Sequence, residues 1–175
     1  LPQPPPDAHQ LPSVADRVQR AFGNFRATFN ADDPVRVQLS QFVTMAEAIF
    51  PGIVARGGDD HLLHGDLHHE NILHDSTRGW LAIDPKGVIG PREFECGRFL
   101  HNFMDTLTAT EMRDAISERA SVIAPVLGIP EAHVLESGLV DMTMGTCWTL
   151  ETEGDAQPDV SRALLKLELL HDLLH

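Results

Sequence analysis

Residues 57–91 interrupt an otherwise helical pattern, and this interruption limits the possible folds more than any other feature of the sequence. The segment contains turns with glycine and proline and three short runs that are typical of β-strands. These runs are residues 61–64, 71–74 and 80–84. Because only the polar turn 75–79 separates the last two, they predict a hairpin. A small sheet set into a helical chain is therefore expected.

Apolar side chains recur at three- and four-residue spacing on both sides of this segment, which predicts helices. The candidate helices are residues 16–29, 35–49, 99–107, 111–126, 131–149 and 161–174. Pro51 and Gly52 are expected to end the second of them, and residues 85–91, with two glycines and two prolines, are expected to form a loop. The predicted fold class is α+β, mostly helical with a small β hairpin that carries a polar loop.

The composition indicates one globular domain with a core, since 42% of the 175 residues are hydrophobic. A formal net charge of −13 argues against nucleic acid as a partner, because phosphate neutralisation needs clustered Lys and Arg. An acidic surface instead attracts a cationic small molecule. No apolar run approaches the roughly 18 residues of a membrane span, so no membrane partner is expected. Cys96 and Cys147 lack the close spacing of a metal site, and two free thiols indicate the cytoplasm.

Residues 1–12 contain five prolines, which excludes a helix there and favours an extended linker. We therefore expect residues 1–12 to connect a preceding domain to a domain formed by residues 13–175. The order along the chain is then linker, helices, small sheet and helices.

Three oxygen-bearing side chains fall at the ends of the predicted strands, and the hairpin brings them to one end of the small sheet. Asp66 follows the first strand, Asn71 begins the second and Asp84 ends the third. The D-x-x-x-x-N spacing of Asp66 and Asn71, with His64 two residues before Asp66, matches the catalytic loop of phosphoryl-transfer enzymes. In that loop the Asp accepts the proton of the attacking hydroxyl, and the Asn and a later Asp hold magnesium. Asp66 is therefore the candidate base, and Asn71 and Asp84 are the candidate Mg²⁺ ligands.

The sequence around these residues resembles the aminoglycoside phosphotransferase and choline kinase superfamily. The similarity lies in H-G-D-x-x-x-x-N, which begins at His64, and in the downstream I-D-P-K-G, which begins at Ile83. Residues 62–73 and 80–87 are most similar to the streptomycin and hydroxyurea phosphotransferase branch. The resemblance is dense over residues 61–102.

The resemblance implies a fold of two lobes with ATP and Mg²⁺ bound between them, and this chain looks like the C-terminal, protein-kinase-like lobe. No segment of this sequence resembles the N-terminal lobe, which would supply a small sheet and a lysine for the nucleotide phosphates. The chain alone is therefore expected to be inactive and to need that lobe in cis. The implied reaction transfers the γ-phosphoryl group of ATP to a hydroxyl of a small molecule, and the implied acceptor is an aminoglycoside-type antibiotic.

Other polar residues near the motif are candidates for supporting roles. Lys86 could bind the nucleotide by neutralising charge on the transferred phosphoryl group, or it could be a solvated loop lysine. His64 is expected to hold the loop in place by hydrogen bonds. Glu95 is expected to brace the loop that follows the second metal ligand by pairing with Arg92 or Arg98.

An acidic run after residue 150 is a candidate acceptor site. Glu151, Glu153 and Asp155 could pair with the ammonium or guanidinium groups of a cationic substrate. An acidic loop in solvent would have the same composition. Trp148, just before this run, is expected to pack in the core rather than to stack on a ligand.

Other interpretations of the same residues stay open. A zinc site is one, because five histidines crowd this region, although no H-E-x-x-H pattern is present: His61, His64, His68, His69 and His74. A metabolic kinase for choline, homoserine or a ketosamine would keep the motif and differ only in its acceptor. A degenerate kinase lobe acting as a non-catalytic binding module is a further alternative. A metal-dependent phosphohydrolase would need more metal-bridging carboxylates than the sequence offers.

Overall fold

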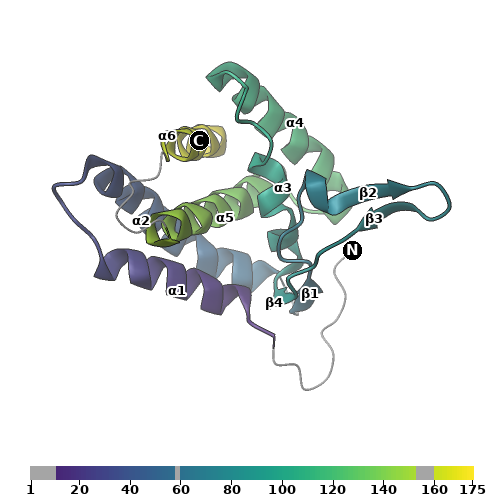
Figure 1. Ribbon diagram of the computed structural model, residues 1–175, viewed down its shortest axis with the longest axis horizontal. Helices are drawn as coiled ribbons and strands as arrows, with labels where there is room; N and C mark the ends of the chain where they lie inside the picture. Colours follow the sequence, from purple (N-terminus) through teal and green to yellow (C-terminus); the bar gives the residue numbers. More distant parts are fainter. Residues whose placement is uncertain (1–10, 58–59, 153–159) are drawn as a thin grey trace.

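The computed structural model describes residues 11–57, 60–152 and 160–175, which contain six α-helices and four short strands (Figure 1). The helices are α1 (Val14–Ala27), α2 (Pro34–Arg56), α3 (Gly97–His101), α4 (Ala109–Leu127), α5 (Glu131–Thr152) and α6 (Ser161–Leu174). The strands are β1 (His61–Leu63), β2 (Ile72–Asp75), β3 (Gly79–Ala82) and β4 (Val88–Gly90), with 3-10 turns η1 (His69–Asn71) and η2 (Arg92–Cys96). This mostly helical chain with a small β content is compatible with the predicted α+β class. Most of the proline-rich segment 1–12 lies outside the described residues.

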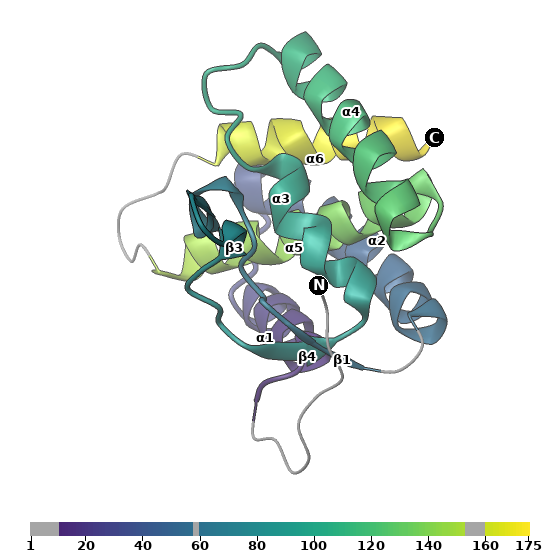
Figure 2. The same ribbon diagram turned by 90° about the vertical axis from the view of Figure 1, so that its right-hand side faces the viewer.

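Helix α5 is the centre of the fold, and it packs against α1, α2, α3, α4 and α6 (Figures 1 and 2). Its core side chains are Val134, Leu135, Leu139, Val140, Met144 and Cys147. Two glycines permit the close approach of α3. A Cβ on Gly138 would lie 2.5 Å from Leu100 Cδ2, and a Cβ on Gly97 would lie 2.8 Å from Asp141 Cβ. The contact between α3 and α5 places the start of α3 beside the site described below.

The first two helices begin where the sequence provides capping side chains. The Ser13 hydroxyl accepts a hydrogen bond from the Asp16 N–H, and the Asp16 carboxylate accepts one from the Ser13 N–H, so the two residues form a capping box. Asp33 accepts two backbone N–H groups at the start of α2, whose first residue is Pro34. These caps explain why both helices start close to their predicted positions.

Helix α2 continues through Pro51 to Arg56, so the prediction that it stops at Pro51 is wrong. The added turn buries Ile53 completely. Arg56 at its end forms ion pairs with Glu93 and Glu136. These tertiary contacts outweigh the local preference of proline for a helix end.

Helix α2 is also long and apolar enough to cross a membrane, by length and composition only, and so are α4 and α5 if they are taken as one bent span. In the structure α2 packs against α5 and buries Leu39, Phe42 and Val43 in the core. The core helix of a globular domain passes the same test, so one or two such helices are weak evidence for a membrane span.

The four strands form two separate antiparallel pairs. Strands β2 and β3 make the predicted hairpin, which projects from the helical body (Figure 1). Strand β1 pairs with β4, with Leu63 opposite Val88. The prediction of a loop over residues 85–91 is therefore wrong for β4. Val88 and Ile89 are buried and β4 contacts α1, so burial favours a strand where glycine and proline indicated a loop.

The predicted helix over residues 99–107 is shorter and begins earlier, because α3 runs from Gly97 to His101. Two arginines from other helices bind the backbone of the segment after it. Arg119 of α4 and Arg162 of α6 donate hydrogen bonds to five carbonyl groups between residues 99 and 107. They satisfy carbonyl groups that a longer helix would have bonded internally.

Candidate active site

The loop between β1 and β2, residues 64–71, holds the predicted base. Its start depends on Gly65, whose φ is +75° and whose Cβ, if present, would lie 2.5 Å from Val88 Cγ2. Glu95 of η2 accepts hydrogen bonds from the backbone N–H groups of His64 and Gly65, the second at 3.1 Å. Glu95 therefore braces the 64–71 loop itself and not, as predicted, the later loop through an arginine.

His64 ties the 64–71 loop to the turn at residues 84–87. Its Nε2 lies 2.7 Å from the carbonyl oxygen of Ile83. Because a carbonyl oxygen only accepts, this contact assigns a proton to Nε2. The carbonyl oxygen of His64 accepts hydrogen bonds from the N–H groups of Lys86 at 2.8 Å and Gly87 at 3.2 Å. These bonds fix the loop and the turn relative to each other.

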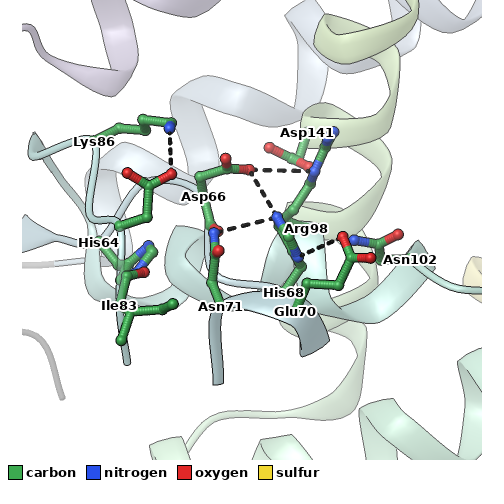
Figure 3. Close-up of polar contacts among 12 residues, drawn as sticks. His64, Asp66, His68, Glu70, Asn71, Ile83, Lys86, Arg98, Asn102 and Asp141 are labelled. Carbon is green, nitrogen blue, oxygen red and sulfur yellow. Dashed lines mark hydrogen bonds and ion pairs between the residues drawn. The ribbon is translucent and has the colours of Figure 1, made fainter. Parts of the chain in front are cut away.

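Asn71 ends the 64–71 loop, and its side chain is buried and fixed (Figure 3). Its Nδ2 donates to the backbone carbonyl of Asp66 at 3.0 Å and lies 3.2 Å from His68 Nε2. Because these contacts use the Nδ2 group, the Oδ1 atom is left as an acceptor. Asn71 thus shapes the loop around Asp66 and also offers an oxygen ligand of the kind that Mg²⁺ prefers.

The Asp66 carboxylate lines a pocket of about 410 Å³. Arg98 Nε lies 3.5 Å from Asp66 Oδ1, and His68 Nε2 lies 4.0 Å from the same atom (Figure 3). The other walls come from α1, both strands of the β1–β4 pair, η2 and α5, and they include Arg17, Leu63, Val88, Phe94, Asp141, Met144 and Trp148. Asp66 is therefore held by a cation on one side and still reaches a cavity large enough for a small molecule.

The charges around this pocket are balanced. Its lining includes three cations and three carboxylates: Arg17, Lys86, Arg98, Asp66, Glu95 and Asp141. Arg17 Nη1 donates to the carbonyl of Gly65 at 3.3 Å, and burial lowers the pKa of its guanidinium, which still stays charged. Asp141 Oδ2 lies 2.8 Å from Nε2 of the buried His101. The pocket thus lacks the acidic excess of the whole chain.

Asp84 lies in the exposed 84–87 turn, where its side chain is 65% exposed. Its φ of +55° is uncommon for a residue other than glycine, and such backbone conformations concentrate at functional sites. Lys86 Nζ lies 2.8 Å from Asp84 Oδ2. This hydrogen bond, together with the charge of Lys86, lowers the pKa of Asp84, and Asp84 in turn raises the pKa of Lys86. Lys86 also lines the Asp66 pocket, so it links Asp84 to that pocket.

His69 anchors the far half of the 64–71 loop to α3 and to the segment that follows it. Its ring stacks on Phe99 with 4.1 Å between centroids and meets Phe103 edge-on at 5.3 Å. Burial, and secondly the charge of Arg119, lower the pKa of His69. The imidazole is therefore neutral at neutral pH and packs as an aromatic ring.

Of the predicted acceptor carboxylates, Glu151 lies among the described residues, and it does not line the Asp66 pocket. Glu151 lies in the last turn of α5, where its Oε2 accepts a hydrogen bond from Asn24 Nδ2 at 3.4 Å, and it lines a different pocket between α1, α2 and α5. Glu153 and Asp155 lie outside the described residues. The prediction of an acidic loop that begins at Glu151 is therefore wrong for this first residue, because α5 extends through it.

Trp148 and the cysteines complete the set of residues singled out by sequence. Trp148 is partly buried against the core and also lines the Asp66 pocket. Cys96 and Cys147 are both buried free thiols, and burial raises their pKa values to about 12. Within the described ranges, no group of three or more His, Cys, Asp or Glu side chains converges in a metal-binding arrangement.

The sequence motifs did not reveal three polar residues that the fold brings to the Asp66 pocket. Arg17, Arg98 and Asp141 come from α1, α3 and α5, and no motif spacing connects them to the 64–71 loop. A signal existed only for Asp141. Asp141, Met144 and Trp148 are three and four residues apart, so they lie on one face of a helix. A charged residue on an otherwise apolar helix face is a signal that the sequence contains.

Curated proteins that resemble the chain are small-molecule kinases. The streptomycin 3''-kinase of Klebsiella pneumoniae is 35% identical over 99 residues, which are 57% of this chain and 32% of that protein. The streptomycin 6-kinase of Streptomyces griseus is 29% identical over 93 residues, 53% of this chain and 30% of that protein. The hydroxyurea phosphotransferase of Kitasatospora aureofaciens is 29% identical over 116 residues, 66% of this chain and 32% of that protein. The chain thus spans about a third of the length of these relatives.

No solved structure matches the chain significantly. A family model does match, and it covers residues 1–153, which include the 64–71 loop, the 84–87 turn and nearly all of α5. On this match the chain belongs to the aminoglycoside/hydroxyurea antibiotic resistance kinase family.

Proposed function

We propose that the chain is the acceptor-binding part of an ATP-dependent phosphotransferase that acts on a hydroxyl of a small molecule, in the first place an aminoglycoside-type antibiotic. The observation that carries this proposal is the arrangement of the 64–71 loop. Asp66 lines a pocket of about 410 Å³, while Asn71 holds the Asp66 backbone and keeps an oxygen available. Family membership and the names of the relatives, streptomycin kinases and a hydroxyurea phosphotransferase, support the same reaction class.

In this proposal Asp66 is the base that accepts the proton of the acceptor hydroxyl. Arg98, 3.5 Å from its Oδ1, orients the carboxylate. The backbone bonds from Asn71 and Glu95 keep the loop in one conformation before the acceptor arrives. Such positioning lowers the barrier because the reacting groups no longer have to find their orientation.

Asn71 and Asp84 would hold Mg²⁺. Their amide and carboxylate oxygens are hard ligands, Asp84 is exposed and the Asn71 oxygen is not used by the loop, so this donor set fits the ion. When bound, ATP and the ion supply the transferable phosphoryl group and part of its charge neutralisation. Lys86 adds a positive charge between Asp84 and the Asp66 pocket, where negative charge develops during transfer.

We place the rest of the nucleotide site on an N-terminal kinase lobe in cis, which makes this chain a protein-kinase-like C-terminal lobe. Leu73 and Ile83 support this assignment. They are exposed apolar side chains that lie two residues after Asn71 and next to Asp84, where they suit a flat apolar ligand or a covering domain. The chain alone would then bind an acceptor without turnover. Use of ATP and two reduced, buried thiols favour the cytoplasm as the location.

The test is ADP release in the presence of Mg²⁺, measured on the protein together with its nucleotide lobe, with streptomycin and hydroxyurea as acceptors. Choline and homoserine serve as comparison acceptors. The proposal predicts turnover that requires both Mg²⁺ and an acceptor and that is lost in Asp66→Asn. ADP release that does not depend on the acceptor, or full turnover in Asp66→Asn, would contradict the proposal. Faster turnover with choline or homoserine would support the proposed reaction but with a different acceptor from the one proposed.

A further inference from the structure

His68 lies beside the proposed base and a proposed metal ligand in the 64–71 loop, and the proposed function gives it no role (Figure 3). Its Nε2 atom lies 3.2 Å from Asn71 Nδ2 and 4.0 Å from Asp66 Oδ1, and its Nδ1 atom lies 4.0 Å from Glu70 Oε2. Nδ1 is buried and has no hydrogen-bond partner among the described residues. Of these three contacts, only the one with Asn71 is short enough for a hydrogen bond.

The backbone sets the orientation of the Asn71 amide. Asn71 Nδ2 lies 3.0 Å from the carbonyl oxygen of Asp66. Because a carbonyl oxygen only accepts hydrogen bonds, the NH₂ group of Asn71 and not its Oδ1 atom has to face this carbonyl. The NH₂ group carries a second hydrogen, and Asn71 is buried, so leaving that hydrogen without an acceptor would be unfavourable. His68 Nε2 is in position to be the acceptor.

This hydrogen bond selects one tautomer of the His68 ring. An Nε2 atom that carried a hydrogen would be a donor facing the Asn71 donor, so the hydrogen of the neutral ring has to be on Nδ1. The carboxylates of Asp66 and Glu70 do not change this, because they lie at the same distance of 4.0 Å from opposite nitrogens and their attractions oppose each other. His64 has the other arrangement, since its Nε2 atom donates to a carbonyl oxygen. The two histidines of one loop are therefore expected in different tautomers.

We propose that His68 is a positioning residue for the metal ligand Asn71. As the Nδ1–H tautomer it accepts the second N–H of the Asn71 amide, so the amide is held at both hydrogens and its Oδ1 atom stays available to Mg²⁺. The statement about Mg²⁺ rests on the proposed function, whereas the tautomer and the hydrogen bond do not. His68 does not line the Asp66 pocket, so it acts through Asn71 and not on the acceptor.

The first test is the tautomer of His68 in this chain, without nucleotide, metal ion or acceptor. The ¹⁵N chemical shifts of the imidazole nitrogens, from long-range ¹H–¹⁵N correlation spectra, show which nitrogen carries the hydrogen. The spectra are recorded at about pH 8.5, where an unperturbed imidazole is neutral. The signals are assigned by their loss in His68→Gln and in His64→Gln. We expect the hydrogen on Nδ1 in His68 and on Nε2 in His64. A hydrogen on Nε2 of His68 overturns the proposal.

The second test separates a positioning role from support of the fold, and it uses the protein together with its nucleotide lobe. His68→Leu removes the acceptor, so the Mg²⁺ concentration for half-maximal turnover should rise by about two- to tenfold, which corresponds to the loss of one hydrogen bond. At saturating Mg²⁺, kcat and the KM of the acceptor should stay within about twofold of the parent. His68→Gln, whose Oε1 atom can accept the same N–H, should recover most of the Mg²⁺ affinity.

The matched control is His74→Leu, the same substitution at a histidine outside the loop. His74 is exposed on β2, where its ring meets that of Trp80 at 5.0 Å between centroids. We expect this variant to keep the Mg²⁺ requirement of the parent. The proposal is overturned if His68→Leu leaves the Mg²⁺ requirement unchanged, if His68→Gln fails to recover it, or if His74→Leu raises it as much as His68→Leu does.

The outcome is separable from that of the proposed function. A hydrogen on Nδ1 of His68, in a protein that shows no Mg²⁺-dependent turnover in any form, would contradict the reaction and support the contact between His68 and Asn71. Mg²⁺-dependent turnover, with a Mg²⁺ requirement that His68→Leu leaves unchanged, would support the reaction and contradict the role of His68.

Discussion

The 64–71 loop and the 84–87 turn carry the two carboxylates of the candidate site, but the protein holds them in different ways. Asp66 is 26% exposed and has Arg98 beside it, and its loop is tied down by Glu95, His64, Asn71 and His69. Asp84 is 65% exposed, and its side chain pairs with Lys86, which is exposed as well. Asp66, the proposed base, is therefore placed by the fold, whereas the position of Asp84, the proposed metal ligand, depends on a short turn and one ion pair.

This difference separates two requirements of phosphoryl transfer. A base has to be in place before the acceptor binds, because orientation is a large part of its contribution. A metal ligand can complete its geometry with the ion, since Mg²⁺ imposes its own octahedral arrangement. Substitutions around Asp66 should therefore change both stability and activity, and substitutions around Asp84 should change activity alone.

The largest expected effect is that of Asp66→Asn. The amide keeps the size of the side chain but no longer accepts a proton, so acceptor-dependent turnover should fall by about 10²- to 10⁴-fold. ADP release on the protein with its nucleotide lobe measures this. A loss of less than about tenfold would mean that Asp66 is not the base, and a urea titration controls for unfolding.

The next effect is that of Gly65→Ala, compared with Gly79→Ala. Both glycines have positive φ, +75° and +78°, and this backbone conformation costs a residue with a Cβ about 1–2 kcal/mol. Only Gly65 also places the new Cβ against Val88, at 2.5 Å, whereas nothing lies within 4 Å at Gly79. The free energy of unfolding from urea titration should therefore fall by about 1–3 kcal/mol more for Gly65→Ala. Equal losses would show that Val88 moves aside without cost.

A smaller effect is expected for Glu95→Gln. The new side chain keeps one acceptor oxygen but replaces the other with an amide N–H group that would face a backbone N–H. The loss of a hydrogen bond to a charged group predicts a decrease of about 1.5–3 kcal/mol in the free energy of unfolding. The matched control is Glu70→Gln in the same region, whose side chain is 72% exposed and which should leave stability unchanged. If Glu95→Gln were as stable as this control, the hydrogen bonds that Glu95 accepts would not stabilise the 64–71 loop.

The smallest effect on stability is expected for Lys86→Met. Lys86 lowers the pKa of Asp84, and the contribution of this pair is present above the unfolded pKa of an Asp and lost as the pH falls through the lowered folded value. Because both groups are exposed, urea titration at neutral pH should show no measurable change. Turnover should fall, and Lys86→Arg, which keeps the charge, should recover part of it. A clear loss of stability in Lys86→Met would remove the contrast between the two regions.

The sequence predicted most of the fold because its signals are local. Helical periodicity located the helices, and the short polar turn before β3 located the hairpin. The caps at Ser13 and Asp33 fix the first two helix starts in the structure. Two of the failures share one cause. Helix α2 passes Pro51 because Ile53 is buried, and β4 forms because Val88 and Ile89 are buried, so in both places burial outweighed the local preference of proline and glycine to break the element.

The residues of the candidate site also fall into two groups, those selected by local spacing and those brought together by tertiary packing. The D-x-x-x-x-N spacing selected Asp66 and Asn71 as candidates, and the structure places both in one loop with a local hydrogen bond between them. Arg17, Arg98 and Asp141 could not be selected, because their proximity to Asp66 arises from the packing of three separate helices. The acidic run was interpreted from charge alone, and Glu151 instead continues α5 and contacts Asn24.

By itself the sequence determined the family and selected the candidate reacting groups, because both are recorded in short motifs with fixed spacing. Only the tertiary structure decided what surrounds Asp66, the proposed base: the cation beside it and the carboxylate that braces its loop. The physical reason is that α3 approaches α5 closely through Gly97 and Gly138, and such contacts depend on packing between segments that are distant in the chain.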